Sequence, residues 1–208
     1  MALLYWRRNE LLTIMNNQMK EQLQDYLNRY DLKFEEEEVD LIYEQLEVKE
    51  FEKKAFLLTE GQVCRYHFFI LKGLVRSFYI DDKGIERITQ FGLENWWITN
   101  LESFKDKTPS LLTMQAIERT KVLCLSSTNL ESLYFSVPKL ERLFRIITER
   151  TLIAVQRRAD FYRRKGSKER YDFLIKMLPN FAQRVPQYML ASYLEISPEY
   201  LSELRKKQ

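Results

Sequence analysis

Short runs of alternating apolar and polar residues fill the middle of the chain, between Phe56 and Leu125. The side chains of residues 74–80 alternate in this way, and the sequence Asp-Asp-Lys-Gly at 81–84 leads into a second run at 85–91. Two such runs joined by a turn of this composition predict a β-hairpin. About six short runs over about 70 residues are typical of an antiparallel sandwich or barrel, so we expect a β-roll here.

A helical period flanks this β segment on both sides. Apolar positions recur every three or four residues in 19–30 and in 35–46, which predicts two helices before the strands. After the strands, a short helix is predicted at 129–135, and Pro138 stops it.

The longest predicted helix spans residues 139–164, which contain neither Pro nor Gly. A helix of this length usually buries its apolar stripe, and a second copy of the chain in a coiled-coil-like seam would cover it. The alternative is a helix that lies across its own domain. Ser167 follows as the predicted N-cap of another helix, which Pro179 ends. The predicted dimer stripe consists of Leu140, Phe144, Ile147, Thr151, Ala154 and Phe161.

Residues 187–206 have the pattern of a helix–turn–helix, a pair of helices in which the second enters the major groove of DNA. Ala191 stands where two helices would cross closely, and Ser197 followed by Pro198 is a good start for the second helix. Glu195 occupies a turn position that favours glycine, at a cost of about 1 kcal/mol. Two helices packed as a core hairpin would match most of the same pattern. The candidate DNA-binding residues are Gln187, Ser197, Glu199, Tyr200, Ser202, Arg205 and Lys206.

The charge of the chain is unevenly distributed. Residues 139–208 contain 16 Lys and Arg against 8 Asp and Glu, whereas residues 1–138 contain 17 against 22. A basic C-terminal third is typical of nucleic-acid binding, although a solvated helical surface would look the same.

Composition excludes several other classes. The chain has two cysteines and one histidine, His67, which are too few for an iron–sulfur cluster or a protein-built zinc site. No apolar run approaches the ~18 residues that cross a bilayer, and no Gly-rich phosphate loop or Gly-x-Ser-x-Gly motif occurs. We therefore expect a cytoplasmic protein that is not an enzyme and holds no cofactor or metal.

Together these elements predict an α+β chain. It comprises an N-terminal antiparallel, jelly-roll-like β-roll, a long dimerisation helix and a C-terminal helix–turn–helix domain. The predicted parts are an N-terminal extension and helix (1–30), the roll (31–136), the dimerisation helix (137–166) and the DNA-binding domain (167–208).

This order of parts resembles the Crp/Fnr superfamily of bacterial transcription regulators, whose roll is a cyclic-nucleotide-binding-like domain. The resemblance covers about residues 30–208, and its best local matches are Glu60-Gly61, the strand pair around Lys72-Gly73, and 185–199. It implies a homodimer that binds an inverted repeat in double-stranded DNA, with RNA polymerase as a further candidate partner and no membrane association.

The resemblance also shows where this chain departs from the cyclic-AMP-binding relatives. Those relatives hold the ligand with a Gly-Glu pair and an Arg-Ser pair, which align here with Ile98-Thr99 and Pro109-Ser110. Without a carboxylate or a guanidinium the anionic phosphate lacks its countercharge, so we expect no response to cyclic AMP and leave the effector open. The degenerate effector pocket is assigned to Thr99, Asn100 and Ser110.

Two hypotheses follow. The first is a sequence-specific DNA-binding regulator, which the basic C-terminal third favours. The second is a dimeric effector-binding or protein-interaction module with a degenerate helix–turn–helix. Glu195, Glu203 (where many relatives carry arginine) and the lack of a wing before Gln208 favour the second hypothesis.

Overall fold

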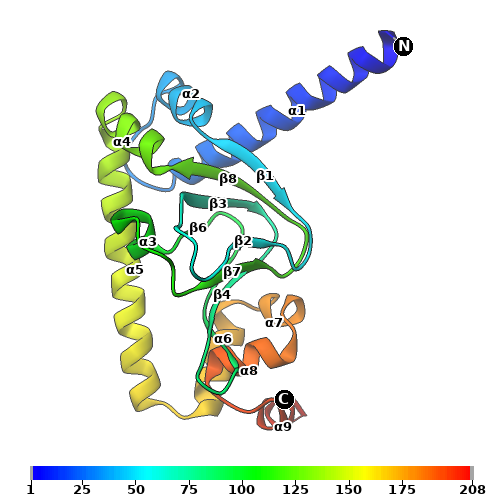
Figure 1. Ribbon diagram of the computed structural model, residues 1–208, viewed down its shortest axis with the longest axis vertical. Helices are drawn as coiled ribbons and strands as arrows, with labels where there is room; N and C mark the ends of the chain where they lie inside the picture. Colours follow the sequence, from blue (N-terminus) through cyan, green and yellow to red (C-terminus); the bar gives the residue numbers. More distant parts are fainter. Residues whose placement is uncertain (1, 207–208) are drawn as a thin grey trace.

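The computed structural model describes residues 2–206, with side chains from residue 14 onward. Its centre is a roll of two antiparallel four-stranded sheets, with helices around it (Figure 1). The strands are β1 (Glu47–Phe51), β2 (Phe56–Leu58), β3 (Tyr66–Lys72), β4 (Val75–Ile80), β5 (Glu86–Gly92), β6 (Trp97–Ile98), β7 (Thr113–Ala116) and β8 (Thr120–Ser126). The helices are α1 (Ala2–Leu27), α2 (Glu36–Glu44), α3 (Leu101–Asp106), α4 (Ser127–Ser136), α5 (Lys139–Arg164), α6 (Ser167–Met177), α7 (Phe181–Arg184), α8 (Gln187–Leu194) and α9 (Pro198–Lys206).

The sheets have the strand orders β1-β8-β3-β6 and β2-β7-β4-β5. The predicted hairpin is confirmed as β4 and β5, which pair from Val75↔Gly92 to Ile80↔Glu86. At its turn Asp81 accepts hydrogen bonds from the backbone amides of Lys83 and Ile85, both at 3.0 Å. The predicted fold class, an antiparallel roll followed by helices and a C-terminal helix–turn–helix, is confirmed.

Two hydrophobic cores divide the molecule. The first lies within the roll and under α1, α2, α4 and the start of α5, and includes Leu23, Phe69 and Leu143. The second lies between the outer face of the β4–β5 hairpin and helices α6 to α9, which we call the helical head (residues 167–206). Because Phe91 of β5 packs on Phe181 of α7 with ring centroids 4.9 Å apart, the helical head rests directly on the roll.

The structure adds elements that the alternation of side chains did not predict. Strand β1 has only Val48 and Phe51 as apolar residues, and helix α3 is a short segment of six residues. Helix α1 is longer than the predicted 19–30 segment and projects away from the roll at its N-terminal end (Figure 1). Residues 1 and 207–208, which belong to the predicted N-terminal extension and DNA-binding domain, lie outside the described residues.

One predicted cap is wrong. Helix α6 begins at Ser167, but its N-cap is Gly166, whose amide donates to the Glu169 carboxylate at 3.0 Å. Ser167 therefore occupies the first helical position, and the carboxylate of Glu169 makes the half of a capping box that binds the N-cap amide.

Candidate functional site

The two helices of the helix–turn–helix, α8 and α9, pack through their apolar faces. Ala191 is fully buried, as the close crossing of two helices requires, and Leu190, Leu194 and Leu201 lie beside it. The Gln187 side chain also joins the two helices, since its amide donates to the carbonyl of Pro198 at 3.3 Å. This packing fixes the angle at which α9 is presented.

The turn between the helices has the positive φ that its position predicted. Glu195 adopts φ 59° and ψ 43°, in the left-handed region. The amide of Ile196 donates to Ala191 O at 3.0 Å, and that of Glu195 donates to Ser192 O at 3.1 Å. These two bonds form a Schellman motif, which closes α8 and turns the chain into α9.

Helix α9 begins with a side-chain cap. The Ser197 hydroxyl accepts a hydrogen bond from the amide of Tyr200 at 3.1 Å, as expected for an N-cap serine. Pro198 is the first residue of the helix, where its missing N–H costs nothing. The start of α9 is therefore well defined, which matters because this end would meet base edges in a DNA groove.

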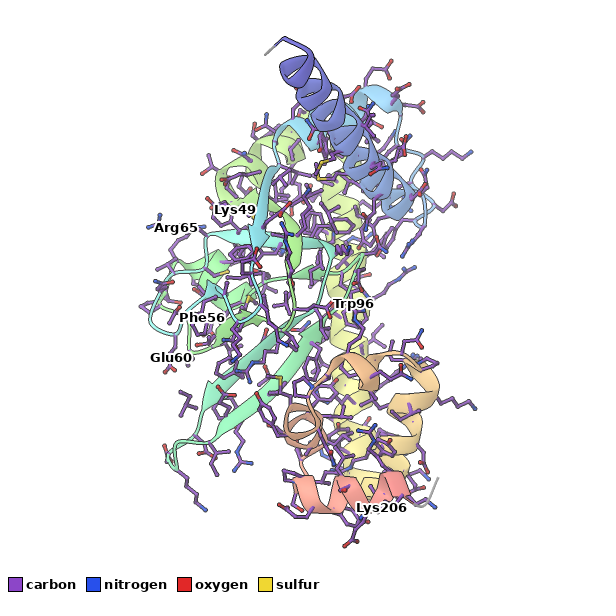
Figure 2. The ribbon with its side chains drawn as sticks, turned by 90° about the vertical axis from the view of Figure 1, so that its right-hand side faces the viewer. Lys49, Phe56, Glu60, Arg65, Trp96 and Lys206 are labelled. Carbon is purple, nitrogen blue, oxygen red and sulfur yellow. The ribbon has the colours of Figure 1, made fainter. Side chains whose placement is uncertain are left out.

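The predicted DNA-binding residues form one surface along α9. Ser197, Glu199, Tyr200, Arg205 and Lys206 are exposed, whereas Ser202 and Gln187 are half-buried. Figure 2 shows Lys206 on the outside of the molecule, at the end opposite α1. Glu203 is exposed on the same helix. Among the described residues, no ion pair uses a charged side chain of α9, so these charges are open to a ligand.

The predicted effector pocket is filled by its own hydrogen bonds. Asn100 caps α3 by accepting from the Ser103 amide at 3.1 Å, and it donates to Ser110 Oγ at 2.8 Å. Ser110 Oγ in turn donates to Leu112 O at 2.8 Å, and Thr99 Oγ1 donates to Tyr66 O at 3.1 Å. In this effector segment (residues 98–110), the side chains of Thr99, Asn100 and Ser110 are therefore bonded within the protein.

Two arginines near the roll do not supply the missing countercharge. Arg76 lies on the same sheet face as Phe91, which is opposite the interior of the roll. Its guanidinium forms an ion pair with Glu86 there. It is buried and also donates to Gln115 Oε1 from Nε at 2.9 Å. Arg87 pairs with Asp81 at the hairpin turn at 2.7 Å. Neither guanidinium faces the effector segment.

His67 is buried among aromatic rings on the outer face of β3. Its ring centroid lies 4.4 Å from that of Phe104 and 5.3 Å from that of Phe144. Burial, with a smaller effect from Lys105, lowers the pKa of His67 to about 3, so the imidazole is neutral at neutral pH. Trp97 lies beside it against Phe144, while Trp96 is exposed (Figure 2).

The predicted stripe of α5 requires a correction. Leu140 and Phe144 are buried in the first core of the same chain, so they are not available to a partner. Ile147 packs partly on the same core, and Phe161 packs on Phe173 of α6 with centroids 4.9 Å apart. Thr151 and Ala154 are exposed. The predicted stripe differs from the structure because α5 first crosses its own roll and then leaves it. The helix therefore buries different faces along its length.

A different row of small and apolar residues is exposed on the second half of α5. Thr148, Leu152, Val155 and Ala159 follow each other at spacings of three or four residues, and we call them the exposed stripe. Leu152 and Val155 are 57% and 60% exposed, which is unusual for residues of this size at neighbouring positions on one helix.

Several contacts that join the helical head to the roll were not predicted. Ser192 of α8 donates to Glu86 O at 3.0 Å and accepts from the Ile88 amide at 3.1 Å, so it satisfies the free edge of β5. Arg184 of α7 pairs with both Glu94 and Glu118. No local pattern could reveal these partners, because they lie more than sixty positions apart in the sequence.

A cleft of about 490 Å³ opens between β2 and β3, and its lining includes Leu58, Gln62, Arg65 and Phe68. In the part of the chain that the structure describes, no cluster of His, Cys, Asp and Glu could hold a metal ion. Within the same residues, no helix is long and apolar enough to cross a membrane.

The sequence and the fold were found to be similar to those of known proteins. Residues 48–136 match the family of cyclic nucleotide-binding domains. No curated protein sequence matches the chain. Among solved structures, FixK2 from Bradyrhizobium japonicum is 20% identical with a TM-score of 0.67, over 78% of this chain and 83% of that one.

Two further structures cover most of both chains. The c-di-GMP responsive global regulator CLP of Xanthomonas campestris is 12% identical with a TM-score of 0.65, over 83% of this chain and 91% of that one. The catabolite activator protein of Thermus thermophilus is 18% identical with a TM-score of 0.55, over 84% and 83%. Residues 48–136 are therefore similar to cyclic nucleotide-binding domains, and the chain as a whole shares the fold of these solved structures.

Proposed function

We propose that the protein is a homodimeric DNA-binding transcription regulator of Crp/Fnr type that does not respond to cyclic AMP. The observation that carries this proposal is the exposed surface of α9, which a capped and closely packed helix–turn–helix presents away from the roll. CLP is a global regulator and the Thermus protein is a catabolite activator, which supports the same class for this protein.

In this proposal α9 enters the major groove with its N-terminal residues at base edges. Ser197, Glu199, Tyr200 and Ser202 lie in that half of the helix and would contact bases, and Glu199 can accept a hydrogen bond from a cytosine amino group. Arg205 and Lys206 lie in the last turn, where contact with phosphate is favoured by charge.

The second half of α5 is the proposed dimer interface. Its exposed stripe would otherwise leave Leu152 and Val155 in water, and a symmetric partner helix would cover them. To enter successive major grooves, two copies of α9 related by the dimer axis would have to lie about 34 Å apart, so the expected target is an inverted repeat. RNA polymerase is a further proposed partner of the DNA-bound dimer, and such a regulator would act in the cytoplasm.

The closed effector segment supports the lack of a cyclic-AMP response. Asn100 and Ser110 are both buried and bonded to each other, and the guanidinium groups of Arg76 and Arg87 pair with Glu86 and Asp81. Residues 31–136 would then act as a scaffold or bind another effector, while residues 137–166 and 167–208 supply the dimer helix and the DNA-binding domain.

The alternative is a dimeric effector-binding or protein-interaction module with a degenerate helix–turn–helix. Its supporting observation is the pair of exposed carboxylates, Glu199 and Glu203, on the surface that would approach phosphate. A gel shift with a randomised duplex pool separates the two functions, with the Glu203→Arg variant as a second protein. Sequence-selective retardation by the wild type supports the regulator. Retardation by neither protein at micromolar concentration supports the module.

A further inference from the structure

The end of helix α8 is held by a side chain from the long helix. The Schellman motif pairs the carbonyls of Ala191 and Ser192, which leaves the carbonyl of Tyr193 without an amide partner among these bonds. Arg158 of α5 fills this place, since its Nη2 donates to Tyr193 O at 3.2 Å. The hydroxyl of Tyr162 donates to the same oxygen at 3.2 Å.

The same guanidinium also reaches the roll. Arg158 Nη1 donates to the carbonyl of Thr89 in β5 at 2.8 Å. One planar group therefore joins α5, β5 and α8, and it holds two carbonyls at fixed positions relative to each other. A planar fork with several donors suits this task better than a single ammonium group does.

Stacked rings hold the guanidinium in its plane. Its carbon lies 4.0 Å from the ring centroid of Tyr193 and 5.0 Å from that of Tyr162. Arg170 of α6 stacks on the same Tyr162 ring at 4.4 Å, and the Tyr193 ring contacts Phe91 of β5 at 5.1 Å. The junction is thus a ladder of alternating aromatic and guanidinium groups that runs from the roll to the start of the helical head.

Arg158 is one of the few residues in the second half of α5 that contact the rest of the chain. From Thr148 to Arg164 every residue of the helix is exposed except Arg158, Phe161 and Tyr162. These three residues face the helical head, and Tyr193 precedes the turn at Glu195 that sets the direction of α9. Beside the second core, the Ser192 bonds and the Arg184 pairs that seat the helical head on the roll, Arg158 thus provides a direct link from α5 to the end of α8.

We propose that Arg158 is a positioning residue for DNA recognition, which sets the orientation of α9 relative to α5 by holding the end of α8. This inference rests on the proposed function, because in a dimer joined through α5 that orientation determines the distance between the two recognition helices. Arg158 itself does not touch DNA. Its loss changes which spacing of half-sites is bound, whereas the bases read within each half-site stay the same.

The test compares Arg158→Lys and Arg158→Gln with Arg157→Lys and Arg157→Gln. Arg157 is the exposed neighbour on the same helix and forms no bond to the helical head. Each protein is titrated with duplexes that carry the selected half-site once, or twice in inverted orientation with spacers of different lengths. Circular dichroism checks that every variant is folded.

We expect the wild type and both Arg157 variants to bind one spacer length best. Both Arg158 variants should bind that duplex about tenfold more weakly and accept neighbouring spacers, while their affinity for a single half-site stays within about twofold. Arg158→Lys is decisive because it keeps the charge and removes only the fork. A spacer profile identical to that of the wild type would overturn the proposal.

A measurement without DNA keeps this result apart from the proposed function. Hydrogen exchange at the Ile88 amide, which donates to Ser192 of α8, reports whether the helical head rests on β5. Faster exchange in the Arg158 variants and not in the Arg157 variants supports the holding role, and unchanged exchange overturns it. If the wild type selects no DNA, the proposed function fails, and the exchange result alone decides whether Arg158 holds the head.

Discussion

The guanidinium of Arg184 in α7 forms a bidentate ion pair with the carboxylate of Glu94, which follows β5, with N–O distances of 3.0 and 2.6 Å. Glu94 also accepts a hydrogen bond from the amide of Gly73 at 3.0 Å. The pair therefore ties the helical head to the β3–β4 turn as well as to β5. Burial tends to raise the pKa of Glu94, but the bonds from Arg184 and Gly73 bring it below its usual value.

Replacing Arg184 should loosen this junction. We expect Arg184→Gln to lower the free energy of unfolding by about 1–3 kcal/mol, because Glu94 and Glu118 lose their shared cation. Urea unfolding measures the change. Arg163→Gln is the matched control, since Arg163 is exposed and makes only a 3.6 Å contact with Asp160. Equal stabilities of the two variants would show that the pair contributes nothing.

The buried imidazole of His67 should make the protein less stable in mild acid. Its folded pKa of about 3 lies below the value of 6.5 of a free imidazole, so the unfolded chain takes up the proton first as the pH falls. Stability is therefore complete above about pH 6.5 and decreases from there towards pH 3, with a loss of about 2 kcal/mol between pH 7 and pH 5. Urea unfolding of His67→Phe at both pH values should show a correspondingly smaller difference. An undiminished pH dependence in the variant would assign the effect to other groups.

The exposed stripe of α5 should hold the dimer together. The double variant Leu152→Glu/Val155→Glu places two carboxylates where apolar contact is proposed, so it should sediment as a folded monomer. Arg157→Glu, on another side of the helix, should remain dimeric. Analytical ultracentrifugation at micromolar concentration distinguishes the two states, and a wild-type protein that is already monomeric would remove the basis of the prediction.

Cyclic AMP should bind poorly if at all. Two charge-assisted contacts of about 1.5–3 kcal/mol each are missing from the effector segment, which corresponds to a loss of about two to four powers of ten in affinity. Isothermal titration calorimetry should detect no binding in the micromolar range. A micromolar dissociation constant would mean that the bonds between Asn100 and Ser110 open to admit the ligand.

Two residues of α9 should have separable effects on DNA binding. Glu199→Ala should relax the preference at one base pair by about 1–3 kcal/mol. Lys206→Ala should weaken binding to all sequences alike and reduce the salt slope by about one unit. Fluorescence anisotropy at several salt concentrations measures both, with the exposed Lys53→Ala of the roll as control. Identical profiles for the two α9 variants would contradict the assigned roles.

Removing a negative charge from the same surface should act in the opposite direction. Glu203 is exposed on α9 and repels phosphate, so Glu203→Arg should tighten binding to every duplex. The same anisotropy titrations test this change. Weaker binding by the variant would place Glu203 against a base and not against the backbone.

Local chemistry predicted the hairpin and the helix–turn–helix well. The Asp-Asp-Lys-Gly turn, the Ser197 cap and the positive φ at Glu195 are each determined by residues within a few positions, so their conformations follow from the sequence. Strand β1 was missed because only two of its five residues are apolar, and its pairing with β8 supplies what its side chains lack.

The arrangement of the parts could not be predicted in the same way. Which face of α5 is buried depends on where the helix crosses the roll, and the periodicity of Leu140 and Phe144 continues past that point without a break. The contacts of Arg158, Arg184 and Ser192 join elements that are distant in the sequence, so no local pattern marks them.

The most direct test of the regulator is selection of bound duplexes from a random pool by the wild-type protein. We expect an enriched inverted repeat whose half-sites are centred about one helical turn, or a multiple of it, apart, and whose enrichment disappears with the Leu152→Glu/Val155→Glu variant. A pool that shows no enriched sequence after several rounds would contradict a DNA-binding function and favour the interaction module.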